Sequence, residues 1–267
     1  MKVDYHVHTN YSPDSCAKLE DVIKSAIEKN LDEICITDHI DNHPNQNAFL
    51  LPNYNSFFKE LDLVKKKYPN ISIKVGGELS LAPYLKEEVA KASKTLDYDF
   101  LIGSSHETNK DYLMTDSIFF KDKIKSNAFE IYFLEVLENV KIFNEFDVYG
   151  HLDYIFRYSV NYYEDNSFYY KDYAHLIDEI LKTLIHKGKG IEINASGYRY
   201  GLNCFHPSMD ILIKYNELGG EIVTIGSDAH SPQYVGTKYD EVIEYLKEGN
   251  TKYIATFNKR KVNFHKI

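Results

Sequence analysis

The chain has 267 residues, of which 43% are hydrophobic, enough for one globular domain with a large core. Its formal net charge of −9 disfavours non-specific binding to nucleic acid or to an anionic membrane, because both are negatively charged. No apolar run resembles a signal peptide or approaches the ~18 residues that cross a bilayer. The three widely spaced cysteines fit a reducing cytoplasm. We therefore expect a cytoplasmic protein without nucleic-acid or membrane partners.

Short apolar runs alternate with amphipathic segments along the whole chain. In chain order, the predicted strands are Lys2–His6, Glu33–Thr37, Ile71–Gly76, Phe100–Gly103, Asp147–His151, Gly190–Asn194, Glu221–Gly226 and, as a further candidate, Tyr253–Phe257. The predicted helices are Leu19–Lys29, Tyr54–Tyr68, Tyr84–Leu96, Ala128–Asn144, Tyr173–Lys187, Ser208–Leu218 and Tyr239–Glu248. This alternation indicates a parallel sheet with right-handed crossovers, and seven or eight such units favour a barrel over an open sheet.

Nothing in the composition divides the chain into smaller units. No linker rich in glycine, serine or proline and no block of like charge interrupts the alternation, so we predict one domain over residues 1–267. Two longer segments, Ile40–Asn53 and Arg157–Asp172, are predicted as loops beside the site. The pattern gives no indication of the oligomeric state.

Potential metal ligands follow one apolar run after another. Asp4, His6 and His8 alternate along the first predicted strand, so they share a face, and two neighbouring imidazoles can bind one divalent metal. Later runs are followed by Asp38, His39, Glu78, His106, His151, Asp228 and His230. Because the carboxyl ends of barrel strands meet on one face, we expect a single metal cluster there. Imidazoles and carboxylates without thiolate suit zinc, manganese or ferrous iron, and the pattern does not choose among them.

Arginine is rare in this chain and its placement is informative. Of the 31 basic residues, only Arg157, Arg199 and Arg260 are arginines, and the first two lie shortly after the predicted strands that end near His151 and Asn194. The planar guanidinium binds phosphate oxygens bidentately, which an ammonium group cannot do. Arg157 and Arg199 are therefore predicted to bind a substrate phosphate.

The ordered set of motifs resembles the PHP (polymerase and histidinol phosphatase) superfamily over nearly the whole chain. The motifs are the opening Asp4-Tyr5-His6-Val7-His8-Thr9, Thr37-Asp38-His39, Glu78, His106, His151 and Ser227-Asp228-Ala229-His230. Within the superfamily the chain is most similar to stand-alone histidinol-phosphate phosphatases. The resemblance implies a distorted (β/α)7 barrel that holds two or three divalent metals at the carboxyl-end face of the strands.

The resemblance also implies a role for each ligand. His6, His8, Glu78 and Asp228 would hold one metal, and Glu78 would bridge to a second metal held by His106 and His151. The third metal would be held by Asp14, which stands where some relatives carry a histidine, together with His39 and His230. Asp4 and Asp38 are expected to support ligating imidazoles as hydrogen-bond partners.

The resulting expectation is a metal-dependent phosphomonoesterase of histidine biosynthesis that hydrolyses L-histidinol phosphate to L-histidinol and phosphate. A metal-activated hydroxide would attack phosphorus, and Asp153, Glu107 or a metal-bound water would protonate the leaving alkoxide. One alternative is a PHP phosphoesterase acting on nucleotides or on another small phosphate ester. Another is a non-catalytic PHP module that binds a partner, although such a module would be expected to have lost ligands.

Overall fold

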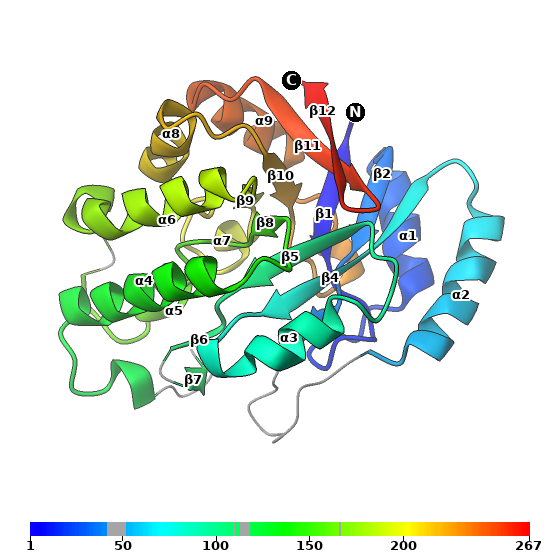
Figure 1. The fold of residues 1–267 in the computed structure, drawn as a ribbon. Helices are drawn as coiled ribbons and strands as arrows, with labels where there is room; N and C mark the ends of the chain where they lie inside the picture. The colour runs from blue at the N-terminus through cyan, green and yellow to red at the C-terminus, as the bar shows by residue number, and fades with distance from the viewer. Residues whose placement is uncertain (42–51, 109, 113–117, 166) are drawn as a thin grey trace.

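The fold is described from a computed structural model that places residues 1–41, 52–108, 110–112, 118–165 and 167–267. Its centre is a sheet of parallel strands that curves into a barrel (Figure 1). The strand order is β1 (Val3–Val7), β2 (Glu33–Ile36), β4 (Ser72–Ser80), β5 (Phe100–Ser104), β8 (Val148–Tyr149), β9 (Gly190–Asn194) and β10 (Val223–Gly226), and the short β3 (His39–Ile40) also pairs with β4. Chain order and spatial order agree, as expected for repeated β/α units.

The barrel closes through two main-chain hydrogen bonds rather than through a regular ladder. No ladder joins β10 to β1 in the described part of the chain. Instead, the Asp228 amide donates to the His6 carbonyl at 2.8 Å and the His8 amide donates to the Ala229 carbonyl at 2.9 Å. We call this junction the seam. The predicted distorted seven-stranded barrel is confirmed, and the seam is where it is most irregular.

A second irregularity lies within β1. Its pairing with β2 shifts between Asp4, which pairs with Ile34, and Val7, which pairs with Ile36. An interval of three residues on β1 therefore pairs with an interval of two residues on β2, as in a β-bulge. A β-bulge changes the direction of nearby side chains and is frequent beside active sites. His6 lies within this shifted stretch.

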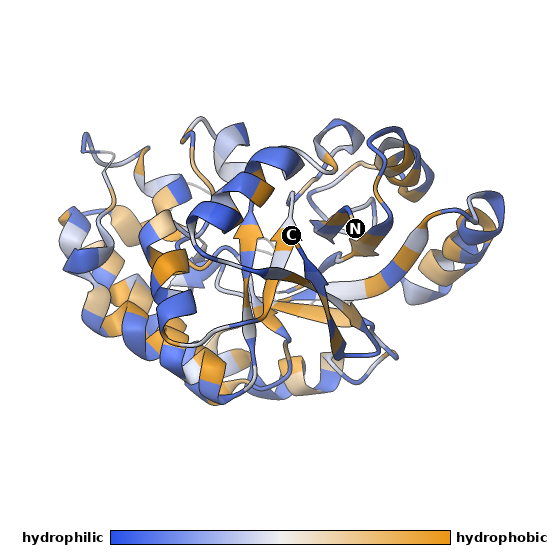
Figure 2. Ribbon diagram, turned by 90° about the horizontal axis from the view of Figure 1, so that it is seen from above, coloured by the Kyte–Doolittle hydropathy of each residue, from blue (hydrophilic) through white to orange (hydrophobic). Residues whose placement is uncertain are grey.

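Amphipathic helices surround the strands (Figures 1 and 2). They are α1 (Leu19–Glu28), α2 (Tyr54–Lys67), α3 (Lys86–Ala92), α4 (Lys125–Ile142), α6 (Ala174–His186), α8 (Met209–Glu217) and α9 (Tyr239–Glu248). Helix α6 illustrates why they pack there, since its buried residues Leu176, Ile177, Ile180, Leu181 and Leu184 form one stripe at helical spacing. None of the helices within the described ranges is long and apolar enough to span a membrane.

Short elements fill the connections. They are the helices α5 (Ile155–Ser159) and α7 (Ser196–Arg199), the 3-10 turns Pro83–Leu85, Ile118–Phe120, Tyr170–Asp172 and Pro232–Tyr234, and the hairpin of β6 (Glu107–Thr108) with β7 (Asp111–Tyr112). The segment Arg157–Asp172 was predicted as a loop, but Arg157 lies on α5, whose five residues are too few to show a helical period. Most of the predicted loop Ile40–Asn53 lies outside the described residues.

The last predicted strand takes a different role from the others. Tyr253–Phe257 is not a further barrel strand, because β11 (Tyr253–Asn258) pairs antiparallel with β12 (Lys261–Lys266). This hairpin packs at the amino ends of the barrel strands, where the Phe257 amide donates to the Tyr5 hydroxyl at 2.9 Å and Arg260 forms an ion pair with Asp147. It therefore covers the end of the barrel opposite the site described below.

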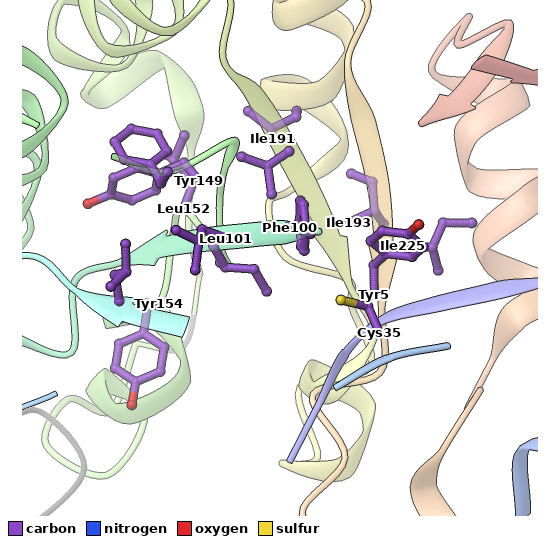
Figure 3. Packing of buried hydrophobic residues seen from close by; sticks show 14 of the residues in the cluster. Tyr5, Cys35, Phe100, Leu101, Tyr149, Leu152, Tyr154, Ile191, Ile193 and Ile225 are labelled. Atoms are coloured by element: carbon purple, nitrogen blue, oxygen red, sulfur yellow. The ribbon is translucent and has the colours of Figure 1, made fainter. Parts of the chain in front are cut away.

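Buried apolar side chains from the strands pack closely together (Figure 3). Tyr5, Phe100, Ile191 and Ile225 are all at most 3% exposed, and the rings of Tyr5 and Phe100 pack edge to face with centroids 5.1 Å apart. At roughly 25 cal/mol per Å² of buried apolar surface, such large side chains dominate the free energy of folding. This apolar packing holds in place the strands whose carboxyl ends carry the site described below.

Candidate metal centre

Histidines and carboxylates converge at the carboxyl ends of the strands. They line a cavity of about 250 Å³ whose walls are Asp14, His39, Glu78, His106, His151, Tyr154, Arg157, Tyr158, Tyr200, Asp228 and His230. His6 and His8 lie beneath it and are fully buried. The strand-end positions therefore bring together all nine residues that the sequence predicts as metal ligands.

Glu78, on β4, lies at the centre of the cluster. Its Oε1 is 3.0 Å from His106 Nε2 and 3.0 Å from His151 Nε2. Its Oε2 is 3.2 Å from His6 Nε2, 3.4 Å from His8 Nε2 and 3.1 Å from His39 Nδ1. The two oxygens thus face two different sets of imidazoles, which is the arrangement that a carboxylate bridging two cations requires.

Two more carboxylates face the outer part of the cluster. Asp228 Oδ1 is 3.8 Å from His6 Nε2, 3.7 Å from His8 Nε2 and 3.5 Å from His230 Nδ1. Asp14 Oδ2 is 3.4 Å from His39 Nε2 and 3.1 Å from His230 Nε2. His8 lies close enough to His39 and His230 for their nitrogens to share one ion, so it borders two of the predicted metal positions.

Unusual backbone conformations aim two of these side chains. His151 has φ of 25° and Asp228 has φ of 54°, a region that residues other than glycine seldom adopt. Such conformations cost about 1–3 kcal/mol each and persist only where the surroundings hold them. At Asp228 the holding contact comes from Arg199, whose Nη2 donates to the Asp228 carbonyl at 2.7 Å.

The donor set fits divalent metal ions. The buried His6 Nε2, His8 Nε2 and His39 Nδ1 have no hydrogen-bond partner within the described part of the chain, although each faces carboxylate oxygens. Unpartnered polar atoms in a protein interior are costly, and a cation between these nitrogens and oxygens would satisfy them. Nitrogen and oxygen ligands without thiolate suit zinc, manganese or ferrous iron.

The charges of the cluster stabilise one another. Burial would raise the pKa of Glu78, but the imidazoles of His6, His106 and His39 hold it well below its ordinary value. Burial would likewise raise the pKa of Asp228, and the nearby Arg157 guanidinium together with His6 reverses the effect. Both carboxylates are therefore ionised and ready to bind a cation at neutral pH.

Asp4 and Asp38 differ from the expectation that they contact ligating imidazoles directly. Asp4 accepts hydrogen bonds from the Ser227 amide at 2.9 Å and the Gly236 amide at 2.7 Å. Asp38 accepts from the Ser12 hydroxyl at 2.8 Å, and Ser12 Oγ in turn lies 3.1 Å from His8 Nδ1. Asp38 therefore reaches His8 only through Ser12, and Asp4 braces the start of the Ser227-Asp228 turn.

The sequence reasoning missed two carboxylates that do contact imidazoles. Asp41 Oδ2 is 3.4 Å from His39 Nδ1 and 3.3 Å from His106 Nδ1. Glu192 Oε1 is 2.6 Å from His6 Nδ1. A signal existed for each, since Asp41 follows His39 at alternate spacing and Glu192 is the lone charge within the apolar run of β9.

The two predicted phosphate-binding arginines lie beside Asp228. Arg157 lines the cavity, donates to Asp228 Oδ2 at 2.9 Å, and has its guanidinium 4.8 Å from the ring centroids of both Tyr154 and Tyr200. Its buried Nε has no partner among the described residues. Arg199 is not among the lining residues of the cavity, and its two terminal nitrogens donate to the carbonyls of Ser227 and Asp228.

The two candidate acids lie behind the wall of the cavity. Asp153 is 1% exposed, with one oxygen 2.6 Å from His206 Nδ1 and the other accepting from the Ser208 amide at 3.0 Å. Glu107 is also 1% exposed, and burial raises its pKa. Neither lines the described cavity, so direct proton transfer to a bound substrate would require either side chain to move. Chain spacing suggested Asp153, but the turn after β8 directs it away.

The fold and the cluster define a barrel protein whose histidines and carboxylates fit a metal site at the carboxyl ends of its strands. A family model described as the PHP domain matches residues 4–196. The chain is 33% identical, over 99% of its length and 100% of the relative, to a probable histidinol-phosphatase of Clostridium acetobutylicum. The chain therefore belongs to the PHP family, which confirms the predicted resemblance.

Further relatives come from Lactococcus lactis. The chain is 30% identical to the histidinol-phosphatase of this organism, over 99% of the chain and 97% of the relative. The fold matches a crystal structure of the histidinol phosphate phosphatase from L. lactis in complex with zinc, L-histidinol and phosphate, with a TM-score of 0.89, 28% identity and 98% coverage of both chains. The similarity to stand-alone histidinol phosphatases thus extends over the whole chain.

Proposed function

We propose that the protein is a metal-dependent phosphomonoesterase that hydrolyses L-histidinol phosphate to L-histidinol and phosphate in histidine biosynthesis. The observation that carries the proposal is the complete ligand set in a chain that matches histidinol phosphatases from end to end. A module that served only to bind a partner would have no need for nine converging ligands.

The ligand roles are part of the proposal. His6, His8, Glu78 and Asp228 would hold the first metal, and Glu78 with His106 and His151 the second. Asp14, His39 and His230 would hold a third. The relative from L. lactis was crystallised with zinc, so zinc is the first metal to test, followed by manganese and ferrous iron.

Bound divalent metals would supply an activated water as the nucleophile and neutralise charge on the phosphate. The residues of the chain would orient the substrate around them. Arg157 lines the cavity, where its guanidinium could donate to a phosphate oxygen, and Arg199 supports the same wall by fixing Asp228. The Tyr158 and Tyr200 rings border the cavity and could pack against the imidazole of the substrate. The roles of Asp153 and Glu107 as leaving-group acids stay predictions, and their buried positions do not support them.

The test is phosphate release from protein reconstituted with zinc, manganese or ferrous iron. L-histidinol phosphate is compared with p-nitrophenyl phosphate and a panel of mononucleotides. We expect kcat/KM for histidinol phosphate to exceed the others by about a hundredfold or more, which is roughly 2.7 kcal/mol of transition-state preference. Faster hydrolysis of a mononucleotide would assign the site to nucleotides instead, and bound metal without any hydrolysis would favour the binding module.

A further inference from the structure

Glu192 is a buried carboxylate that the proposed reaction does not use. It lies in the middle of β9, is 1% exposed, and points into the barrel below the metal cluster. Its Oε1 is 2.6 Å from His6 Nδ1. Its Oε2 accepts from the His151 amide at 2.9 Å and from Asn194 Nδ2 at 3.1 Å. One side chain thus contacts two predicted ligands that belong to different metals.

The Glu192 side chain reaches across the seam to His6. Glu192 lies on β9 and His6 on β1, and β10 runs between them. At that point β10 carries Gly226, where an added Cβ would lie 2.1 Å from Glu192 Oε1 and 2.5 Å from His6 Cβ. The glycine leaves the space that the contact between carboxylate and imidazole occupies. Glycine, glutamate and histidine therefore form one unit across the seam.

The chemistry of the contact fixes the tautomer of His6. The contact joins a ring nitrogen to a carboxylate oxygen, and with that oxygen as the acceptor His6 Nδ1 carries the hydrogen. In the neutral ring, Nε2 then carries the lone pair, and Nε2 faces Glu78 and Asp228 at the first metal position. A carboxylate behind a ligating imidazole also raises its basicity.

The second oxygen acts on the backbone of His151. This residue has φ of 25°, and its amide donates to Glu192 Oε2. The hydrogen bond holds the main chain in the conformation that directs His151 Nε2 to Glu78. We propose that Glu192 is a positioning residue that orients His6 to bind the first metal and His151 to bind the second. The binding of both metals then depends on this one buried carboxylate. This inference rests on the metal sites of the proposed function, not on the identity of the substrate.

The substitution Glu192→Gln tests the inference with little change in shape. If the new carbonyl faces His6 Nδ1, the amide NH2 opposes the His151 N–H, and two donors face each other. If the side chain turns over, the NH2 faces His6 Nδ1 and forces the hydrogen onto Nε2, which can then no longer bind a metal. Either orientation disturbs one ligand.

The matched control is Glu33→Gln. Glu33 is likewise a buried carboxylate on a barrel strand, and it accepts hydrogen bonds from the Tyr5 and Ser72 hydroxyls at the amino end of β2. It has no contact with the cluster. Both variants replace a buried carboxyl group with an amide, so a general loss of stability affects both, whereas a positioning role affects only Glu192→Gln.

The measurement is zinc affinity of the purified metal-free proteins, by competition with a chromogenic chelator, with the melting temperature of each protein recorded alongside. We expect Glu192→Gln to bind zinc about 10–100-fold more weakly and Glu33→Gln to match the wild type. In the zinc-loaded wild type, nitrogen NMR of the histidine side chains should show His6 protonated at Nδ1, and this signal should change in Glu192→Gln only.

Unchanged zinc affinity in Glu192→Gln, or equal losses in both variants, would overturn the positioning role. Should Glu192→Gln fail to fold, Glu192→Asp provides the same test, because its shorter carboxylate cannot reach His6 and His151 together, and wild-type affinity in it would refute the inference. Zinc binding by the wild type without hydrolysis of histidinol phosphate would contradict the proposed function alone. A wild type that binds no zinc would overturn both.

Discussion

A single carboxylate organises the cluster at the scale of residues. Glu78 faces five imidazoles with its two oxygens: those of His6, His8, His39, His106 and His151. The contacts with Glu78 explain why its pKa lies far below the ordinary value despite complete burial, which by itself would raise it. Any change at this position therefore acts on every part of the site at once.

Glu78→Gln is expected to remove tightly bound metal and abolish phosphate release. The amide has no charge and one of its two polar atoms is a donor, so it cannot bridge two cations. The loss of affinity should exceed the roughly 10–100-fold that the loss of a supporting hydrogen bond costs. Metal content by mass spectrometry checks this, with the exposed Glu87→Gln on α3 as the control. Retention of all metal by the variant would refute the bridging role.

His151→Ala is expected to cost far more activity than stability. The imidazole faces Glu78 and the cavity, so its loss removes a predicted ligand while the apolar barrel below stays intact. The comparison is kcat/KM against thermal unfolding, with the exposed His186→Ala on α6 as the control. If His151→Ala lost its fold together with its activity, the residue would be structural.

At the scale of elements, most helices and strands could be predicted from the periodic spacing of apolar residues. Long amphipathic segments such as α6 and α9, and buried runs such as β9, repeat at a clear period, so their places could be predicted within a few residues. Elements of four or five residues such as α5 and α7 are shorter than two helical turns and show no period. Consequently Arg157 was expected on a loop although it lies on a helix.

The sequence could predict which residues are candidate metal ligands, but not which residues form hydrogen bonds with those ligands. Strand ends converge in a barrel, so the positions of His6, Glu78 and Asp228 followed from the alternation. Which hydrogen bonds support them depends on the bulge in β1 and on the turn after β8, and neither has a signature in the residue pattern. This is why Asp153 was expected at the substrate and Glu192 was not expected at His6.

Gly226→Ala should weaken metal binding although no ligand is changed. The new methyl group would lie where Glu192 Oε1 and His6 Cβ now pack, so the seam must widen or Glu192 must withdraw. Inserting a methyl group into a tight interior costs about 1–3 kcal/mol of stability. Zinc affinity and melting temperature are measured on the same sample. The control is Gly188→Ala, where the methyl group meets open space but the φ of 65° adds backbone strain, so it should lower the melting temperature without weakening zinc binding. Equal zinc affinity in wild type and Gly226→Ala would show that the contact is not needed.

At the scale of the whole molecule, stability and metal binding are expected to be linked through pH. In the metal-free protein, burial lowers the pKa of His106, but Glu78 and Asp41 outweigh burial and raise the pKa to about 9, above the ordinary value of 6.5. A folded-state pKa above the unfolded value stabilises the fold fully below about pH 6.5, and this contribution is lost as the pH rises through about 9. Metal ligation requires the neutral imidazole, so metal and proton compete.

As the pH rises, we expect the metal-free protein to become less stable and the stabilisation by zinc to increase. Between pH 6.5 and 9, the melting temperature of chelator-treated protein should fall, and the difference between zinc-loaded and metal-free protein should grow. Calorimetry in buffers of different ionisation enthalpy should detect proton release when zinc binds. Zinc uptake without proton release at pH 7 would contradict the protonated state inferred for His106.

The seam gives the metal cluster a direct connection to the closure of the barrel. The two hydrogen bonds that close it use the main-chain atoms of His6, His8 and Asp228, whose side chains are predicted ligands of the same metal. Opening the barrel and releasing the metal would then be a single event. The Asp228 and His8 amides should accordingly exchange hydrogen with solvent slowly when zinc is bound and much faster when it is removed, while the Ile193 amide inside β9 changes little. Without metal, the barrel should open first at the seam. Proteases should therefore cleave the metal-free protein near the seam before the rest of it unfolds.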